Sequence, residues 1–224
     1  MKNPRLILIV FATILFWSSC KKETVEPVEM GYKYFPVNIG HWAIYDVDSI
    51  SYNDFTGLID SFKYQIKEIV ESDFIDNQGR TSQRLERYIR LSDTSAWTIK
   101  DVWFETLTAS TAERVEENLR MIKLVFPISD SFEWNGNNYN IIGEQKYSYQ
   151  DVFTPALINN ISMDSTVTVM QKNSQTLISE DYQKEIYAVH VGMVYKKYVA
   201  LEKQPTGTIT SGIDYSYTLR SYGN

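Results

Sequence analysis

Cysteine and histidine are scarce in this sequence. Its single cysteine, Cys20, cannot form a disulfide within the chain, so the fold must depend on apolar packing and hydrogen bonds. The two histidines, His41 and His190, stand in no metal-ligand pattern, and the acidic cluster at 46–54 lacks the glycine and terminal glutamate of a calcium loop. Glycine-rich phosphate loops and the GxSxG nucleophile pattern are also absent. We therefore expect a noncatalytic protein with no metal and no cofactor.

Clusters of basic residues are missing as well. The chain has 22 Lys and Arg against 28 Asp and Glu, a formal net charge of −6, and no stretch of it is rich in Lys and Arg. Proteins that bind nucleic acid neutralise the backbone phosphates with clustered basic side chains. We expect no nucleic-acid partner.

Aromatic residues, by contrast, are abundant. They make up 14% of the chain, with 16 tyrosines, and apolar residues as a whole make up 43%. Flat rings pack well on the pleated surface of a sheet, so this composition favours a mainly β fold. The length of 224 residues suits one domain behind a targeting segment.

The first twenty residues have the order of a secretory signal. Lys2 and Arg5 precede the apolar run 6–17, which is followed by two serines and Cys20. The run is too short to cross a bilayer core of about 30 Å, which takes roughly 20 apolar residues. We expect residues 1–19 to be an export signal that is removed.

The segment 15–20, Leu-Phe-Trp-Ser-Ser-Cys, resembles the lipobox of bacterial lipoproteins, with Trp17 where an aliphatic or small residue is usual. The resemblance implies that the sulfur of Cys20 carries diacylglycerol and that several acyl chains anchor the protein to a membrane. Since no aspartate follows the cysteine, we expect the outer membrane, with its periplasmic or surface face left open. An ordinary secretory signal with an incidental free cysteine is the alternative.

Beyond the signal, the charged segment at 20–31 is expected to be a flexible tether. Residues 32–224 are expected to form a single antiparallel β domain. Phe62, Tyr64 and Ile66 alternate with polar residues, and the turn sequence at 76–79 precedes a second alternating run at 85–91, which predicts a hairpin. Further strands are expected at 97–104, 120–126, 139–149, 167–169, 186–191, 194–201 and 213–219. One or two short helices are expected at 111–119 and 151–160.

Three local patterns bracket the domain: Tyr34-Phe35-Pro36 with Gly40, Trp42 and Tyr45; 185–188 with 191–196; and Gly212 with Tyr215, Tyr217 and Leu219. They resemble a broad group of exported bacterial lipoproteins of uncharacterised function, which look like members of the LolA/LolB superfamily of lipoprotein carriers. The resemblance implies a half-barrel, in which a curved antiparallel sheet wraps a hydrophobic cavity closed by helices. His190 stands where such relatives often have glycine, which leaves the turn geometry there open.

Three tryptophans are the candidate ligand-binding residues. Trp97 and Trp103 are expected on one strand face together with Ile99, and Trp42 begins an earlier strand. Their rings suit a stacking platform for glycans or the lining of a lipid cavity, while core packing is the plainer alternative.

The leading hypothesis for function is a noncatalytic, lipid-anchored envelope protein that binds an apolar ligand or an acyl chain in its curved sheet. A surface module that binds glycans or another protein is the alternative. A hydrolase with scattered carboxylates is a third hypothesis, since two catalytic acids leave little trace in a sequence.

Overall fold

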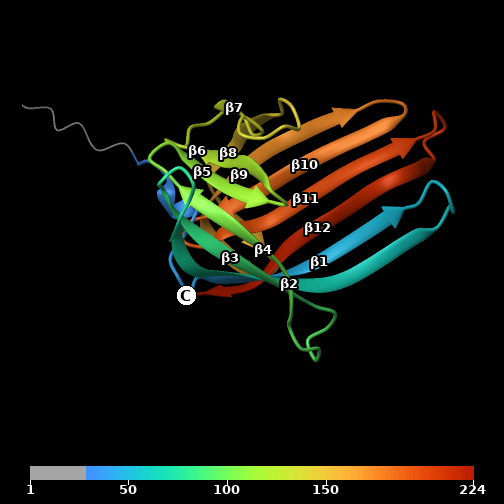
Figure 1. Ribbon diagram of the computed structural model, residues 1–224. Coiled ribbons are helices and arrows are strands. Elements are labelled where there is room, and N and C mark those ends of the chain that lie inside the picture. The colour runs from blue at the N-terminus through green and yellow to red at the C-terminus, as the bar shows by residue number, and fades with distance from the viewer. Residues whose placement is uncertain (1–28) are drawn as a thin grey trace, which may run out of the picture.

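The computed structural model describes residues 29–224; the predicted export signal and Cys20 lie outside them. The described chain forms one sheet of twelve antiparallel strands (Figure 1). The strands are β1 (Trp42–Tyr52), β2 (Ile59–Ile75), β3 (Thr81–Arg90), β4 (Thr98–Leu107), β5 (Thr111–Glu116), β6 (Leu119–Val125), β7 (Glu133–Asn135), β8 (Lys146–Ile158), β9 (Ile161–Gln175), β10 (Ser179–Ala188), β11 (Gly192–Lys203) and β12 (Ile209–Gly223).

Strand order in the sheet is β6-β5-β4-β3-β2-β1-β12-β11-β10-β9-β8-β7. Every neighbouring pair is consecutive in the chain except β1 and β12, whose antiparallel ladder runs from Trp42 opposite Gly223 to Tyr52 opposite Gly212. The first and last strands therefore lie at the middle of the sheet, and the chain between β6 and β7 connects its two edges.

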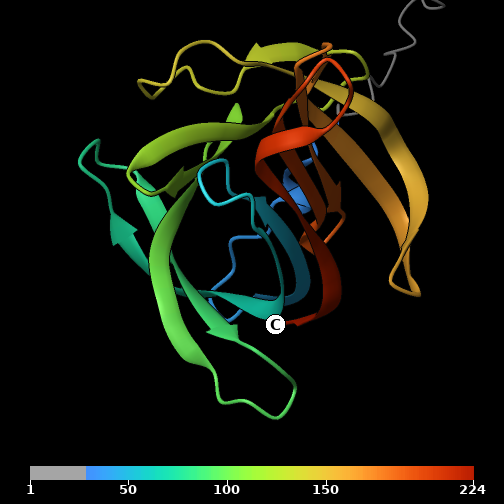
Figure 2. The ribbon, with the colours of Figure 1, turned by 90° about the vertical axis from the view of Figure 1, so that its right-hand side faces the viewer.

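The sheet curls until those two edges meet, which makes a nearly closed barrel (Figures 1 and 2). The amide of Ile122 in β6 donates to the carbonyl of Gly136, just after β7, at 2.9 Å, and the indole of Trp134 donates to the carbonyl of Ile122 at 3.0 Å. The hydroxyl of Tyr149 bonds both backbone groups of Val125 at 2.8 Å. We call this contact between β6 and β7 the seam.

The expected half-barrel and short helices require correction. Segment 111–119 is β5, a turn and the start of β6, and segment 151–160 belongs to β8 and its turn into β9. Within residues 29–224 the helical structure is a single 3-10 turn at Tyr32–Tyr34, so the helices that would close a LolA/LolB-type cavity are not seen there. This part of the chain also contains no helix long and apolar enough to cross a membrane.

One end of the barrel is closed by residues 30–41, which we call the N-terminal plug. Phe35 is buried inside the barrel, and the ring of His41 lies 3.1 Å from the carbonyl of Val191 and 2.7 Å from the side chain of Asn224. Seen from the opposite end, the plug lies at the far side of the barrel, behind the hairpin tips (Figure 2). The barrel is therefore packed with apolar side chains at the plug end.

His190 lies in the turn between β10 and β11. Its φ of 64° is in the left-handed region that glycine favours, and its amide donates to the carbonyl of Lys33 in the plug at 2.8 Å. His190 thus has a backbone conformation typical of glycine. The turn also fixes the plug to the barrel wall.

Candidate functional site

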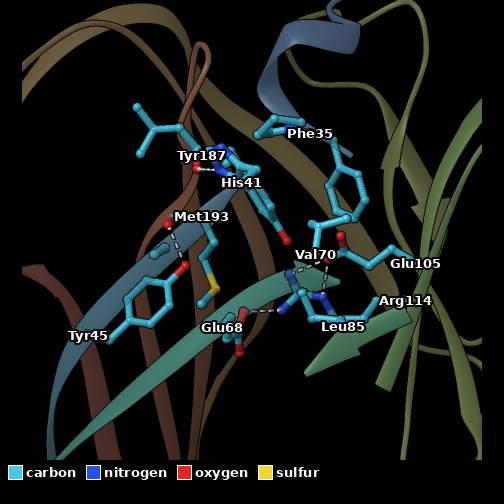
Figure 3. Close-up of a pocket in the computed structure, with 14 residues that line it drawn as sticks. Phe35, His41, Tyr45, Glu68, Val70, Leu85, Glu105, Arg114, Tyr187 and Met193 are labelled. Carbon is cyan, nitrogen blue, oxygen red and sulfur yellow. Dashed lines mark hydrogen bonds and ion pairs between the residues drawn. The ribbon is translucent and has the colours of Figure 1, made fainter. Parts of the chain in front are cut away.

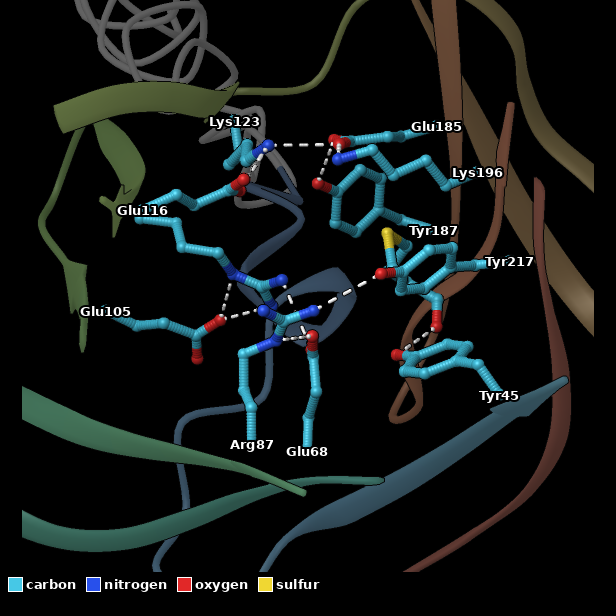
Figure 4. Close-up of polar contacts among 12 residues, drawn as sticks. Tyr45, Glu68, Arg87, Glu105, Glu116, Lys123, Glu185, Tyr187, Lys196 and Tyr217 are labelled. Carbon is cyan, nitrogen blue, oxygen red and sulfur yellow. Dashed lines mark hydrogen bonds and ion pairs between the residues drawn. The ribbon is translucent and has the colours of Figure 1, made fainter. Parts of the chain in front are cut away.

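Charged side chains gather inside the barrel. They come from strands on both sides of it, and they alternate along these strands with outward-facing residues (Figure 4). Four are acidic and four are basic: Glu68, Glu105, Glu116 and Glu185, with Arg87, Arg114, Lys123 and Lys196. We call this set the ion network.

Half of the ion network lies on β2 to β5. Glu68 joins two guanidinium groups, with Oε1 2.9 Å from Nε of Arg87 and Oε2 3.2 Å from Nη1 of Arg114. Nε of Arg114 also donates to Glu105 at 2.8 Å. All four side chains are at most 9% exposed, so each charge depends on its partners rather than on water.

The other half links β5 and β6 to β10 and β11. Nζ of Lys123 lies 2.9 Å from Glu116 and 3.0 Å from Glu185, and Nζ of Lys196 lies 3.3 Å from Glu185. The hydroxyl of Tyr187 donates to the second oxygen of Glu185 at 2.7 Å. These contacts cross the barrel interior near the seam and connect its two halves.

The pKa values show which charges the network stabilises. Burial by itself raises the pKa of Glu116, but Lys123 and Lys196 outweigh it and hold that pKa at about 2. The same two ammonium groups hold the pKa of Glu185 well below its usual range despite burial. Burial opposes the charge of Lys123, yet the two glutamates raise its pKa. These acids and bases are therefore ionised at neutral pH.

Glu105 behaves differently from the other acids. Its burial raises the pKa of the carboxyl group above the usual value, even though Arg114 lies beside it and lowers the pKa. The environment of this residue is therefore less favourable to a negative charge than that of Glu116.

A cavity of about 290 Å³ lies beside the network on the side of the β1–β2 hairpin. Its lining combines rings with cationic groups: Tyr64, Trp103, Tyr215 and Tyr217 with Arg87, Lys100, Arg114 and Lys196. We call it the tyrosine cavity. Burial raises the pKa of Tyr64 to about 12, and it raises the pKa of Tyr217 above its ordinary value, so both hydroxyls are neutral hydrogen-bond donors at pH 7.

A second cavity, of about 230 Å³, lies nearer the seam. Side-chain amides distinguish its lining from that of the tyrosine cavity: Asn137, Gln145, Gln171 and Gln183, beside charged residues of the ion network and Tyr198. We call it the amide cavity. It shares Glu116, Lys196 and Tyr215 with the tyrosine cavity, so the two are neighbours within the barrel.

A third, much smaller cavity of about 30 Å³ lies between the plug and the ion network (Figure 3). Phe35 and His41 line it on the plug side, and Glu105, Arg114 and Tyr187 line it on the other. Its volume has room for only about one or two water molecules. It is therefore part of the packing around the plug rather than a ligand site.

The three candidate tryptophans do not gather in one place. Trp103 lines the tyrosine cavity, where the guanidinium of Arg87 lies 3.4 Å from its ring centroid. Trp97 precedes β4 and stacks with Arg90 at 4.4 Å, away from the cavity lining. Trp42 alternates with the inward Ala43 and so faces outward. Of the three, only Trp103 faces a cavity large enough for a ligand.

The expectation that Trp97, Ile99 and Trp103 share a face was wrong because of a β-bulge. Ile99 pairs with Tyr88 and Asp101 with Arg87, so Lys100 is an extra residue in β4. The bulge reverses the alternation, and Ile99 is 58% exposed while Trp103 turns inward.

Comparison with known proteins places the chain in no family: no family model and no curated protein matches it. A crystal structure described as a "putative lipoprotein" from Parabacteroides distasonis aligns with 85% of this chain and 98% of its own, at 10% sequence identity and a TM-score of 0.43. A similarity at this level identifies neither the family nor the function of the chain.

Proposed function

We propose that this protein is a noncatalytic, lipid-anchored envelope protein that binds a small polar ligand inside its barrel. The observation that carries the proposal is the tyrosine cavity, a hollow lined by rings, hydroxyls and cationic groups. Ligand sites in proteins are typically concave and combine aromatic walls with a few fixed polar groups. With the neighbouring amide cavity, the space reaches the range of ~300–1,000 Å³ usual for small-molecule sites.

The charge of the interior favours a polar ligand over the acyl chain suggested by the LolA/LolB resemblance. An acyl chain in the tyrosine cavity would displace water from Lys100, Lys196 and the tyrosine hydroxyls without offering them a hydrogen bond. Such desolvation is unfavourable for polar groups and more so for charged ones. A ligand with its own acceptors replaces the hydrogen bonds that water makes.

The lipid anchor in the proposal is supported by the lipobox-like segment at 15–20. Met30 and Gly31 pack beside Ile128 at the plug end of the barrel, so a tether from Cys20 attaches at that end (Figure 1). The hairpin end then points away from the anchored end. This orientation leaves the side of the barrel that holds the tyrosine cavity free to meet a ligand.

Thermal unfolding of the purified protein with a panel of probes tests the proposal. The panel contains neutral saccharides, amino acids, nucleotides, phosphate and palmitate. A polar probe at about 100 times its Kd is expected to stabilise the protein by ~2.7 kcal/mol, a rise in Tm of roughly 5–10 °C. Tyr64→Leu should abolish or reduce the rise, and Tyr88→Leu, on the outer face of β3, should not.

A rise in Tm with palmitate alone would contradict the proposal and restore the acyl-carrier hypothesis. If no probe changes Tm, or if Tyr64→Leu and Tyr88→Leu behave alike, the tyrosine cavity is not a binding site for these ligands and the proposal fails.

A further inference from the structure

The amide cavity contains a buried donor without a partner. Gln171 lies in β9 at a β-bulge, because Gln183 of β10 pairs with Lys172 and Lys184 pairs with Met170. Its side chain is 5% exposed, and Nε2 has no hydrogen-bond partner among the described residues. Buried polar groups are nearly always hydrogen-bonded, and an unpaired one destabilises the fold. An acceptor supplied by a ligand would satisfy this group.

The neighbouring amides are held in place by one another. Nε2 of Gln145 donates to Oε1 of Gln183 at 3.1 Å and to the backbone carbonyl of Gln171 at 3.2 Å. Asn137 is buried, and its Oδ1 accepts from Asn140 at 3.0 Å. A carboxamide offers both donors and an acceptor and carries no charge, which matches the hydrogen bonding of a hydroxyl group.

The charged residues of this cavity neutralise one another. Glu116 and Glu185 each pair with Lys123, and Glu185 also pairs with Lys196. Two acids and two bases leave no excess charge to attract an ion, and a charged ligand would lose its hydration without gaining a free counter-ion. The cavity therefore favours an uncharged ligand.

Two tyrosine rings form one wall. Tyr198 of β11 and Tyr215 of β12 stack on each other, with ring centroids 5.0 Å apart and planes inclined by 9°. Both rings line the amide cavity. Because the rings stack on each other, the face of Tyr198 that is turned away from Tyr215 is the surface on which a saturated ring with C–H groups on its faces can pack.

We infer that the amide cavity binds an uncharged saccharide ring, with an oxygen of the sugar accepting a hydrogen bond from Nε2 of Gln171 and the ring packed on Tyr198, which Tyr215 supports from behind. This inference rests on the proposed function and specifies the chemical class of its ligand. It adds a decisive contact in the neighbouring amide cavity to the tyrosine cavity on which the proposed function is based.

The test measures binding of neutral mono- and disaccharides to the full-length purified protein by calorimetry and by saturation-transfer NMR. Glucose and glucuronate serve as a matched pair of a neutral and a charged ligand. Gln171→Leu removes the donor and keeps the volume, and Gln150→Leu, on the exposed side of β8, is its control. Gln171→Leu should weaken saccharide binding roughly tenfold, while Gln150→Leu leaves it unchanged.

Stability separates a binding role of Gln171 from a structural one. Because the substitution removes an unpaired buried donor, Gln171→Leu should unfold at the same temperature as the wild type or above it while binding falls. A second variant, Tyr198→Leu, should also weaken binding by removing the aromatic wall.

Four outcomes would overturn the inference. Saccharides that bind equally well to wild type and Gln171→Leu place the site elsewhere, and tighter binding of glucuronate than of glucose contradicts the neutral character. If saccharides fail to bind at millimolar concentration while another polar probe binds in a Tyr64-dependent manner, the inference fails and the proposed function stands. If no polar probe binds at all, both fail.

Discussion

Lys123 offers a direct test of whether the ion network holds the barrel together. Its ammonium group is 2% exposed and lies within 3.0 Å of both Glu116 and Glu185. Lys123→Met keeps the length of the side chain but removes the charge. Glu185 then keeps Lys196 at 3.3 Å, whereas Glu116 loses its close partner.

The expected loss of stability follows from burial of these carboxylates. Removing one partner of a buried ion pair typically destabilises a protein by ~3–5 kcal/mol, because the remaining charge is left without water or a counter-ion. For a chain of 224 residues this corresponds to a fall in Tm of roughly 10 °C. The loss should shrink at low pH, where protonation removes the unpaired charge.

The assay is urea unfolding at pH 7 of the wild type, Lys123→Met and a matched control, Lys146→Met. Lys146 pairs with Glu133 at 2.9 Å, but both side chains are more than half exposed, so the control should change stability by less than ~1 kcal/mol. The double variant Lys123→Met with Glu116→Gln should recover part of the loss. If Lys123→Met is no more destabilising than Lys146→Met, the ion network does not stabilise the barrel and the reasoning is refuted.

Three further predictions follow from the same features. Glu116 has a pKa of about 2 in the folded protein against an ordinary value of 4.5. Its ionised carboxylate therefore stabilises the fold by about 3 kcal/mol above pH 4.5, and this stabilisation is lost as pH falls toward 2. Urea unfolding across that pH range should show the loss. The raised pKa of Glu105 acts in the opposite direction and reduces the acid loss that Glu116 and Glu185 cause. Cys20→Ala should move the protein from the membrane fraction to the soluble fraction or stall its processing, and an unchanged membrane fraction of normally processed protein would remove the lipid anchor from the proposal. Trp134→Phe removes the indole hydrogen bond across the seam and should lower the free energy of unfolding by about 1 kcal/mol. The control Trp97→Phe should change the free energy of unfolding very little. Equal effects of the two substitutions would show that the indole hydrogen bond is not needed to close the barrel.

The local strand pattern was readable from the sequence. The alternation at Tyr64 and Ile66 and the run from 85 to 91 predicted the β2–β3 hairpin, which the structure confirms. Arg87 belongs to the same phase as Leu85, so its position among apolar residues was already a sign that this charge faces inward. The strand predicted at 120–126 is also confirmed, since β6 covers Leu119–Val125.

Closure of the barrel could not be predicted, because it depends on contacts between residues far apart in the chain. The pairing of Trp42 with Gly223 has no local signature. Glu113, Glu116 and Glu117 suggested a short helix at 111–119. The basic partners of Glu113 and Glu116 lie on another strand, as with Lys123 on β6, and the segment itself does not show them. The bulge at Lys100 likewise follows from pairing with β3, so the inward position of Trp103 could not be derived from alternation alone.

The position of the two terminal strands at the centre of the sheet affects how the molecule is assembled. β1 has hydrogen-bonding partners on one side within the first half of the chain, but its other side waits for β12, the last strand to be made. Until then the outer edge of β1 is an unpaired strand that other chains can join. A newly made chain that stops short of residue 209 therefore has no partner for that edge and is expected to aggregate rather than to accumulate as a smaller stable domain.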